Sequence, residues 1–355
     1  MKRVVALLVA TLALAACGKE GPPVPPEQRL PQVISDLTGA VEGRHVVLSW
    51  TNPSKRADQS RLPDLTTLRI YRREESGDAP AKPALISWGQ VVGYDQIAEI
   101  KLDSPAPAEM EGQRLRWADT AAMTGRRYVY VVTATDSIGR ASPPSNRLDL
   151  VAFSAPRPPE QLQARPGENQ VMLSWSAPAT AIDGSPLREP LTYQLLRAQT
   201  RAEPYRPVGE PTANLAVTDT NLQNEQSYYY VVRAIRSQGT TKAFSEQSAT
   251  VTATPVDLTP PPPPSNLVAV PAEGSVRLAW DPSRAPDVAG YFVYRAPAPN
   301  GEFSRVNLTA VSATVFVDRS VERGKSYRYA ITAIDQARKP NESQRSEAVS
   351  VTLPQ

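Results

Sequence analysis

Three short stretches, "HVVLSW" (45–50), "QVMLSW" (170–175) and "SVRLAW" (275–280), share one pattern. In each of them every second residue is apolar and the last residue is tryptophan, which is typical of a strand with one buried face. A leucine stands thirteen residues before each tryptophan. The same pattern at three places predicts a structural unit that is repeated along the chain.

The segments that follow these stretches also match one another. "LRIYRR", "YQLLRA" and "YFVYRA" align, and further on "YVYVVTATD", "YYYVVRAIR" and "YRYAITAID" each begin with a tyrosine that an aspartate precedes by nine residues. These aspartates are Asp119, Asp219 and Asp318. The segments are short, rich in Val, Tyr, Thr and Ile, and separated by turn residues, which predicts antiparallel β-sandwiches. An aspartate that recurs in every unit indicates a role in the fold.

Together these motifs resemble fibronectin type III domains over nearly all of residues 33–354. The resemblance implies an all-β fold, with three tandem fibronectin-III-like β-sandwiches in an extended array. In that family a tryptophan on the second strand fills the core between the two sheets, and a tyrosine at the start of the sixth strand forms the tyrosine corner. The matching tryptophans are Trp50, Trp175 and Trp280. The matching tyrosines are Tyr128, Tyr228 and Tyr327.

Proline-rich segments mark the boundaries between the repeated units. They are "SAPRPPE" at 154–160 and "TPVDLTPPPPPS" at 254–265. Proline has a fixed φ and no backbone donor, so these segments are expected to act as semi-rigid linkers. The predicted domains are residues 33–155, 156–256 and 257–355.

The start of the chain predicts export and lipid attachment. Lys2 and Arg3 precede an apolar run at 4–16, which at about 20 Å is too short for a hydrocarbon core of about 30 Å. The run indicates a signal peptide over residues 1–16, with a short membrane anchor as the alternative. "LAAC" resembles the bacterial lipobox, and this resemblance implies that Cys17 carries a covalent lipid. Cys17 is the only cysteine, and exported proteins usually pair their cysteines, so a lipid explains it better than a buried free thiol does.

Residues 17–32 are predicted to be a lipidated cysteine followed by a proline-rich tether. "CGKEGPPVPPE" resembles the lipoprotein start "CGxKGPL" through Cys17, Gly18, Gly21 and Pro22. In Gram-negative lipoproteins an aspartate after the cysteine commonly signals retention in the inner membrane. Gly18 occupies that place, so the resemblance implies the outer membrane of a Gram-negative bacterium. It leaves open whether the domains face the periplasm or the exterior.

The first unit contains an insertion that the other two lack. Tyr71 and Asp119 are 48 residues apart, whereas the matching residues of the other units are 23 and 24 apart. The extra residues lie within about 74–114, and they include Trp88 and Tyr94. An exposed tryptophan on such a loop would stack on a sugar ring or anchor a partner protein. The alternative is that Trp88 folds back and covers its own domain.

Composition argues against nucleic-acid binding and catalysis. The net charge of +3 over 355 residues comes without a clustered basic face, which a nucleic-acid partner would require. The single histidine, His45, has no second histidine and no free thiol with which to form a catalytic triad or a zinc site. We therefore expect no enzyme activity, no metal and no cofactor other than the lipid on Cys17.

These inferences together predict a membrane-anchored lipoprotein that acts as a protein-interaction, scaffold or adhesion module in the bacterial envelope. Its expected partners are the membrane, through the lipid, and an envelope protein or glycan. One alternative is a carbohydrate- or peptidoglycan-binding lipoprotein that uses the loop of the first domain. The other, suggested by the "CGKEGPP" start, is an accessory factor in envelope assembly.

Overall fold

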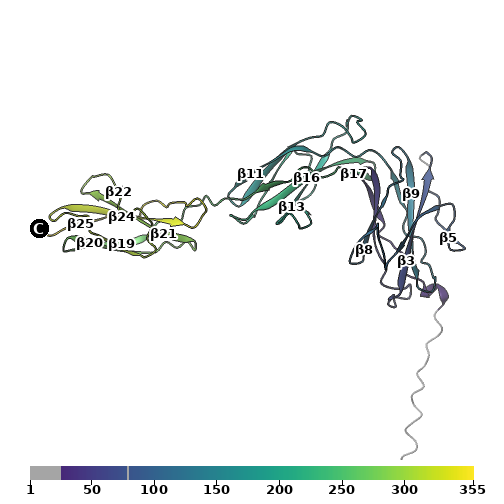
Figure 1. Ribbon diagram of the computed structural model, residues 1–355, viewed down its shortest axis with the longest axis horizontal. Coiled ribbons are helices and arrows are strands. Elements are labelled where there is room, and N and C mark those ends of the chain that lie inside the picture. The colour runs from purple at the N-terminus through teal and green to yellow at the C-terminus, as the bar shows by residue number, and fades with distance from the viewer. Residues whose placement is uncertain (1–24, 78–79) are drawn as a thin grey trace, which may run out of the picture. The chain divides into compact units, whose positions relative to one another are not determined.

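The computed structural model describes residues 25–77 and 80–355 (Figure 1). Cys17, the predicted signal peptide and the first part of the tether lie outside the described residues. Within the described part every element is a β-strand except η1 (Pro26–Arg29), a 3-10 helix. The predicted all-β fold with tandem β-sandwiches is confirmed. No helix in the described ranges has the length and apolar character needed to cross a membrane.

The first sandwich consists of two antiparallel sheets. One has the order β10–β9–β3–β6, and its strands are β3 (Leu65–Glu75), β6 (Asp95–Lys101), β9 (Arg127–Asp136) and β10 (Leu148–Val151). The other contains the order β1–β2–β8–β7, and its strands are β1 (Thr38–Glu42), β2 (His45–Thr51), β7 (Glu109–Glu111) and β8 (Arg114–Asp119). Alternation along β2 turns Val46, Leu48 and Trp50 into the core between the sheets.

A strand that is distant in sequence extends the second of these sheets. β17 (Thr241–Phe244) pairs in parallel with β1, with Val41 opposite Ala243, and the amide of Gly43 donates to the carbonyl of Phe244 at 3.1 Å. This pairing covers an edge that β1 would otherwise leave open. The chain accordingly divides into two compact units, and the first comprises the residues through Pro156 together with Thr180–Pro186 and Ile235–Ser245.

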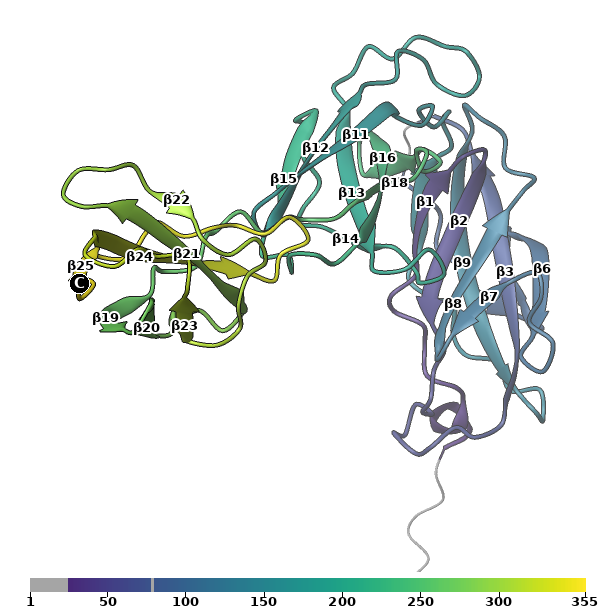
Figure 2. The same ribbon diagram turned by 60° about the vertical axis from the view of Figure 1, so that its left-hand side comes forward.

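The second and third sandwiches repeat the same two-sheet plan. The strands of the second are β11 (Glu160–Gly167), β12 (Gln170–Ser176) and β15 (Ala216–Asp219) in one sheet, and β13 (Thr192–Ala198), β14 (Arg206–Pro207), β16 (Tyr228–Gln238) and β18 (Val251–Ala253) in the other. The strands of the third are β19 (Ser265–Ala272), β20 (Ser275–Asp281) and β23 (Val315–Asp318), and β21 (Val288–Pro297), β22 (Ser304–Arg305), β24 (Ser326–Asp335) and β25 (Val349–Thr352). Figure 2 shows β19, β20 and β23 as one layer of the third sandwich and β21, β22 and β24 as the other.

The three repeated tryptophans lie in the three cores, but they differ in whether the indole nitrogen forms a hydrogen bond. The indole nitrogen of Trp50 donates to Oδ1 of Asn52 at 3.0 Å. The rings of Trp175 and Trp280 pack against tyrosine rings on the facing strand, with centroids 5.6 and 5.5 Å apart. Their indole nitrogens are buried without a hydrogen-bond acceptor in the described part of the chain. Packing, and not polar pairing, is therefore the contribution that the three tryptophans share.

Candidate functional site

The inserted residues of the first repeat fold over the sheet that holds β3 and β9. β6 pairs with β3 from Thr67 opposite Lys101 to Arg72 opposite Asp95. The corresponding strands of the other sandwiches, β14 and β22, have only two residues each. Between β3 and β6, a short ribbon forms from β4 (Ile86–Ser87) and β5 (Gln90–Val91). The insertion therefore lengthens an edge strand and adds a ribbon.

The base of this ribbon is a small apolar cluster on the outer face of the sheet. It is formed by Tyr71, Val91, Tyr94, Val129 and Val131. Only 8% of Tyr94 is exposed, and its hydroxyl donates to the carbonyl oxygen of Lys82 at 3.1 Å. Burial raises the pKa of Tyr94. Tyr94 therefore holds the insertion against its own domain, and its ring is not available to a partner.

Trp88 has the opposite environment. It occupies the tip of the ribbon, its side chain is 100% exposed, and its φ of +52° is followed by a φ of +77° at Gly89. Two successive residues with positive φ form the tight turn that suits a two-residue hairpin, where Asn and Gly are the usual occupants. A tryptophan in this position is uncommon. The alternative that Trp88 covers its own domain is wrong, because its ring is fully exposed.

Two exposed aliphatic side chains, Leu85 and Val92, stand three residues before and four residues after Trp88 in the sequence, at the two ends of the ribbon. The amide of Val92 donates to the carbonyl of Leu85 at 2.8 Å, and Val91 pairs with Ile86. Since neighbours along a strand alternate between its faces, burial of Val91 on the sheet side turns Leu85 and Val92 outward. Leu85 is 65% and Val92 55% exposed. We call Leu85, Trp88 and Val92 the tip patch.

The repeated aspartates belong to a polar network that recurs in all three sandwiches. Oδ2 of Asp119 accepts from the guanidinium of Arg72 at 2.7 Å and from the hydroxyl of Tyr130 at 2.9 Å. The other two networks join Arg197, Asp219 and Tyr230, and Arg295, Asp318 and Tyr329. Burial and the neighbouring carboxylate raise the pKa of Tyr130. Asp119 therefore hydrogen-bonds to residues of its own domain and has a structural role.

The arginines and the second tyrosines of these networks are residues that the sequence interpretation missed. A signal was present, because an arginine follows each third-strand marker and a tyrosine stands two places after each corner tyrosine. At the corners themselves, the hydroxyl of Tyr128 accepts from the amide of Met123 at 3.1 Å, and Tyr228 and Tyr327 make the same contact five residues upstream. Both kinds of tyrosine serve the scaffold.

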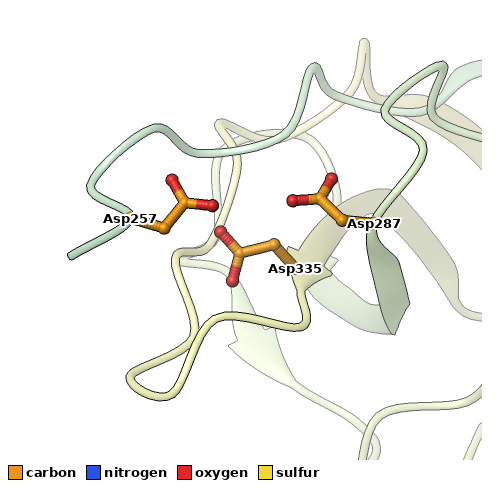
Figure 3. A group of neighbouring side chains, drawn as sticks. All are labelled: Asp257, Asp287 and Asp335. Atoms are coloured by element: carbon orange, nitrogen blue, oxygen red, sulfur yellow. The ribbon is translucent and has the colours of Figure 1, made fainter. Parts of the chain in front are cut away.

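Three aspartates gather at one end of the third sandwich. Figure 3 shows the carboxylates of Asp257, Asp287 and Asp335 turned toward one another, with one oxygen of each within 4.8 Å of the others. Oδ1 of Asp335 accepts from the amides of Ala337 and Asn341. Carboxylate oxygens suit Ca²⁺, which takes roughly six to eight oxygen ligands. Three carboxylates alone are therefore an incomplete cation site.

His45 lies at the start of β2 in the first unit. It lines a pocket of about 200 Å³ with Arg44, Asp183 and Phe153 among the other lining residues. This volume is below the range of roughly 300–1,000 Å³ that small-molecule sites occupy. The absence of catalytic activity stays a prediction.

Residues 264–353 match a fibronectin type III family model. Its description is "Fibronectin type III domain SaeA third domain", and the resemblance inferred from the sequence is confirmed for this part of the chain. The match coincides with the third sandwich, from the start of β19 to the end of β25.

Curated relatives match longer stretches. Exoglucanase B of Cellulomonas fimi is 29% identical over 307 residues, which cover 83% of this chain and 26% of that protein. Amylopullulanase of Thermoanaerobacterium saccharolyticum is 39% identical over 90 residues, or 25% of this chain and 7% of that protein. The chain thus spans about a quarter or less of these relatives. The solved FN1–FN3 domains of chicken CNTN1 cover 92% of this chain at 13% identity with a TM-score of 0.29, and the match covers 99% of that chain.

Proposed function

We propose that this protein is a lipid-anchored, non-catalytic binding module of the outer membrane of a Gram-negative bacterium, and that the tip patch contacts an apolar surface of an envelope protein. The observation that carries the proposal is the complete exposure of Trp88 on a ribbon whose base is buried. A rigid base lowers the entropy lost when a loop binds. Tryptophan is also among the residues that most often dominate binding energy at protein interfaces.

The neighbours of Trp88 favour a protein surface over a sugar. Leu85 and Val92 are aliphatic and exposed, and aliphatic side chains offer no hydrogen bonds to sugar hydroxyls. Ser87 and Gln90 are the polar residues that pair next to the turn. An exposed apolar group of this kind is typical of protein contact sites.

Crosslinking in cells tests this proposal. A photoreactive residue at Ser87, beside the tip, should capture one envelope protein. The substitution Trp88→Ala in the same chain should remove that product. Leu308→Ala is the matched control, since Leu308 is 95% exposed but lies in the third sandwich, and it should leave the product unchanged. A crosslink that persists without Trp88 contradicts the proposal.

The anchor requires its own experiment because Cys17 lies outside the described residues. Several acyl chains hold a protein at a membrane stably, whereas one chain does so only marginally. Replacing Cys17 with Ala should therefore move the protein to the soluble fraction and remove the lipid from the N-terminal peptide mass. An unchanged membrane fraction would reject the anchor and leave the tip patch to be tested separately.

Carbohydrate binding is the second candidate. The relatives named exoglucanase and amylopullulanase favour it, and the exposed face of Trp88 is able to stack on a sugar ring. Glycan arrays that include peptidoglycan fragments, probed with wild type, Trp88→Ala and Leu308→Ala, distinguish the two candidates. A signal that only Trp88→Ala removes would favour a glycan, and no signal in wild type would end this candidate.

A further inference from the structure

Four valines are exposed on the outer face of the sheet of β19, β20 and β23 in the third sandwich, all of them on the two flanking strands. Val268, Val270, Val315 and Val317 are between 38% and 60% exposed. Residues that alternate with these valines on β19 and β23, such as Leu267 and Phe316, face the core on the other side. β19 and β23 are therefore apolar on both faces, although a sandwich needs only its inner face to be apolar.

The exposed valines form two rows across the sheet. Val268 lies opposite Ala279, which in turn lies opposite Val315. Val270 and Val317 flank Arg277 in the next row. Cross-strand neighbours have side chains about 5 Å apart, so the valines and Ala279 form one continuous surface. We call this surface the valine face.

The equivalent face of the second sandwich shows that the fold does not require these valines. The register there places Gln163, Ser174 and Ala216 in one row and Arg165, Met172 and Thr218 in the other. The four positions held by valine in the third sandwich are thus Gln, Arg, Ala and Thr in the second. Since the backbone arrangement is the same, packing within the domain does not explain why these four positions are valine.

Charged residues at the valine face are arranged so that the face complements itself. Arg277 and Asp281 lie on β20 two residues before and two residues after Ala279, and both are exposed. If the β20 strands of two copies face each other in antiparallel orientation around Ala279, Arg277 of each copy lies opposite Asp281 of the other. A parallel orientation would instead place Arg277 over Arg277. The charges therefore select the antiparallel arrangement.

We propose that the valine face is a two-fold interface between two copies of this chain, with the two sheets stacked face to face and Arg277 paired with Asp281 across it. The face is one three-stranded sheet, which places the interface at the small end of the range for specific complexes. The dimer is accordingly weak and reversible. The proposal is independent of the tip patch and of the lipid anchor.

Sedimentation velocity tests the dimer. The chain from Gly18 to Gln355 is measured across a roughly hundredfold range of concentration, because a weak dimer forms by mass action. The wild-type sedimentation coefficient should rise with concentration toward that of a dimer. Val315→Glu should remain monomeric, whereas Ala216→Glu, at the matching position of the second sandwich, should behave as wild type.

Charge exchange tests the orientation. Arg277→Asp should abolish association because it sets two aspartates against each other, and the double variant Arg277→Asp/Asp281→Arg should restore it. Circular dichroism of each variant checks that it is folded. A monomeric wild type, a folded Val315→Glu that still dimerises, or a folded double variant that stays monomeric would each overturn the proposal.

Discussion

The first and third sandwiches cover the outer face of the same sheet in different ways. In the first, Tyr71, Val129 and Val131 are completely buried beneath the inserted ribbon. In the third, arginine side chains cover aromatic rings that have no such lid. Arg345 lies 4.8 Å from the ring centroid of Tyr294, the counterpart of Tyr71, and Arg305 lies 3.7 Å from that of Phe292.

This difference separates two roles within one insertion. The base of the ribbon, with Val91 and Tyr94, covers the outer face of the sheet in the first sandwich. Arginine side chains cover the same face in the third sandwich. The base of the ribbon therefore contributes to the stability of the fold. The tip of the ribbon covers none of the apolar residues of the sheet, because Trp88 is fully exposed. The comparison therefore assigns packing to Tyr94 and shows that Trp88, which we propose binds a partner, is not needed for packing.

The largest expected effect is the loss of the lid. Tyr94→Ala removes a buried ring and its hydrogen bond to Lys82, and it exposes the cluster around Tyr71. We expect the first sandwich to lose about 2–4 kcal/mol of unfolding free energy. Urea unfolding of wild type and variant measures this. A loss below about 0.5 kcal/mol would show that the insertion rests on the sheet without stabilising it.

The first and third sandwiches also differ in the charged groups that surround one repeated aspartate. Oδ2 of Asp136 accepts from Arg56 and Arg140, both at 2.8 Å. Its counterpart Asp335 lies beside Asp257 and Asp287 instead. Asp136→Asn should cost about 1–3 kcal/mol, because two guanidinium groups lose a charged acceptor. Asp287→Asn should leave stability unchanged or raise it, since it removes a like charge. Urea unfolding measures the stability of both variants. Equal losses of unfolding free energy would contradict the expected difference between the two sites.

Acid should affect the Asp136 site in a defined direction. Burial alone would raise the pKa of Asp136, but the hydrogen bonds from Arg56 and Arg140 outweigh burial and hold that pKa below its ordinary value of 3.8. Its folded pKa is therefore lower than its unfolded one. The stabilisation is fully present above pH 3.8 and is lost as the pH falls below this value toward the folded pKa. Urea unfolding of the first sandwich at pH 7 and pH 3 should show a smaller difference for Asp136→Asn than for wild type.

The sequence predicted the parts of the fold that repeat. Trp50 and Tyr128 could be located because two further copies share their spacing, whereas residues 74–114 have no second copy to align. Neither hydrophobic pattern nor spacing separates Tyr94 from Trp88, since both are aromatic residues in one irregular segment. The pairing of β17 with β1 was equally hidden, because nothing in the spacing of Thr241–Phe244 indicates a parallel partner. The valine face was readable in principle, as "NLVAV" and "TVFVD" are apolar at successive positions.

A smaller effect is expected from the arginine layer of the third sandwich. Arg345 stacks on Tyr294 and on Phe303, 4.8 and 5.1 Å from their ring centroids. Exposed stacking of this kind is worth about 0.5–1 kcal/mol. Arg345→Ala should therefore cost about that much, several times less than Tyr94→Ala. Arg345→Lys keeps the charge but removes the planar group. If stacking provides the stability, this variant should lose about as much unfolding free energy as Arg345→Ala. A cost as large as that of Tyr94→Ala would mean that the arginine layer is a lid of equal strength.

The smallest effect on stability is expected at the tip itself. Trp88 is fully exposed among the described residues of its domain, so Trp88→Ala should change the unfolding free energy by less than about 0.5 kcal/mol. The turn at Trp88 has a positive φ, and Trp88→Gly should even stabilise slightly because glycine adopts this conformation without strain. Thermal unfolding of wild type and both variants measures these differences in stability. If Trp88→Ala instead destabilises by as much as Tyr94→Ala, the ring packs within its own domain, and the division between a packing base and a binding tip fails.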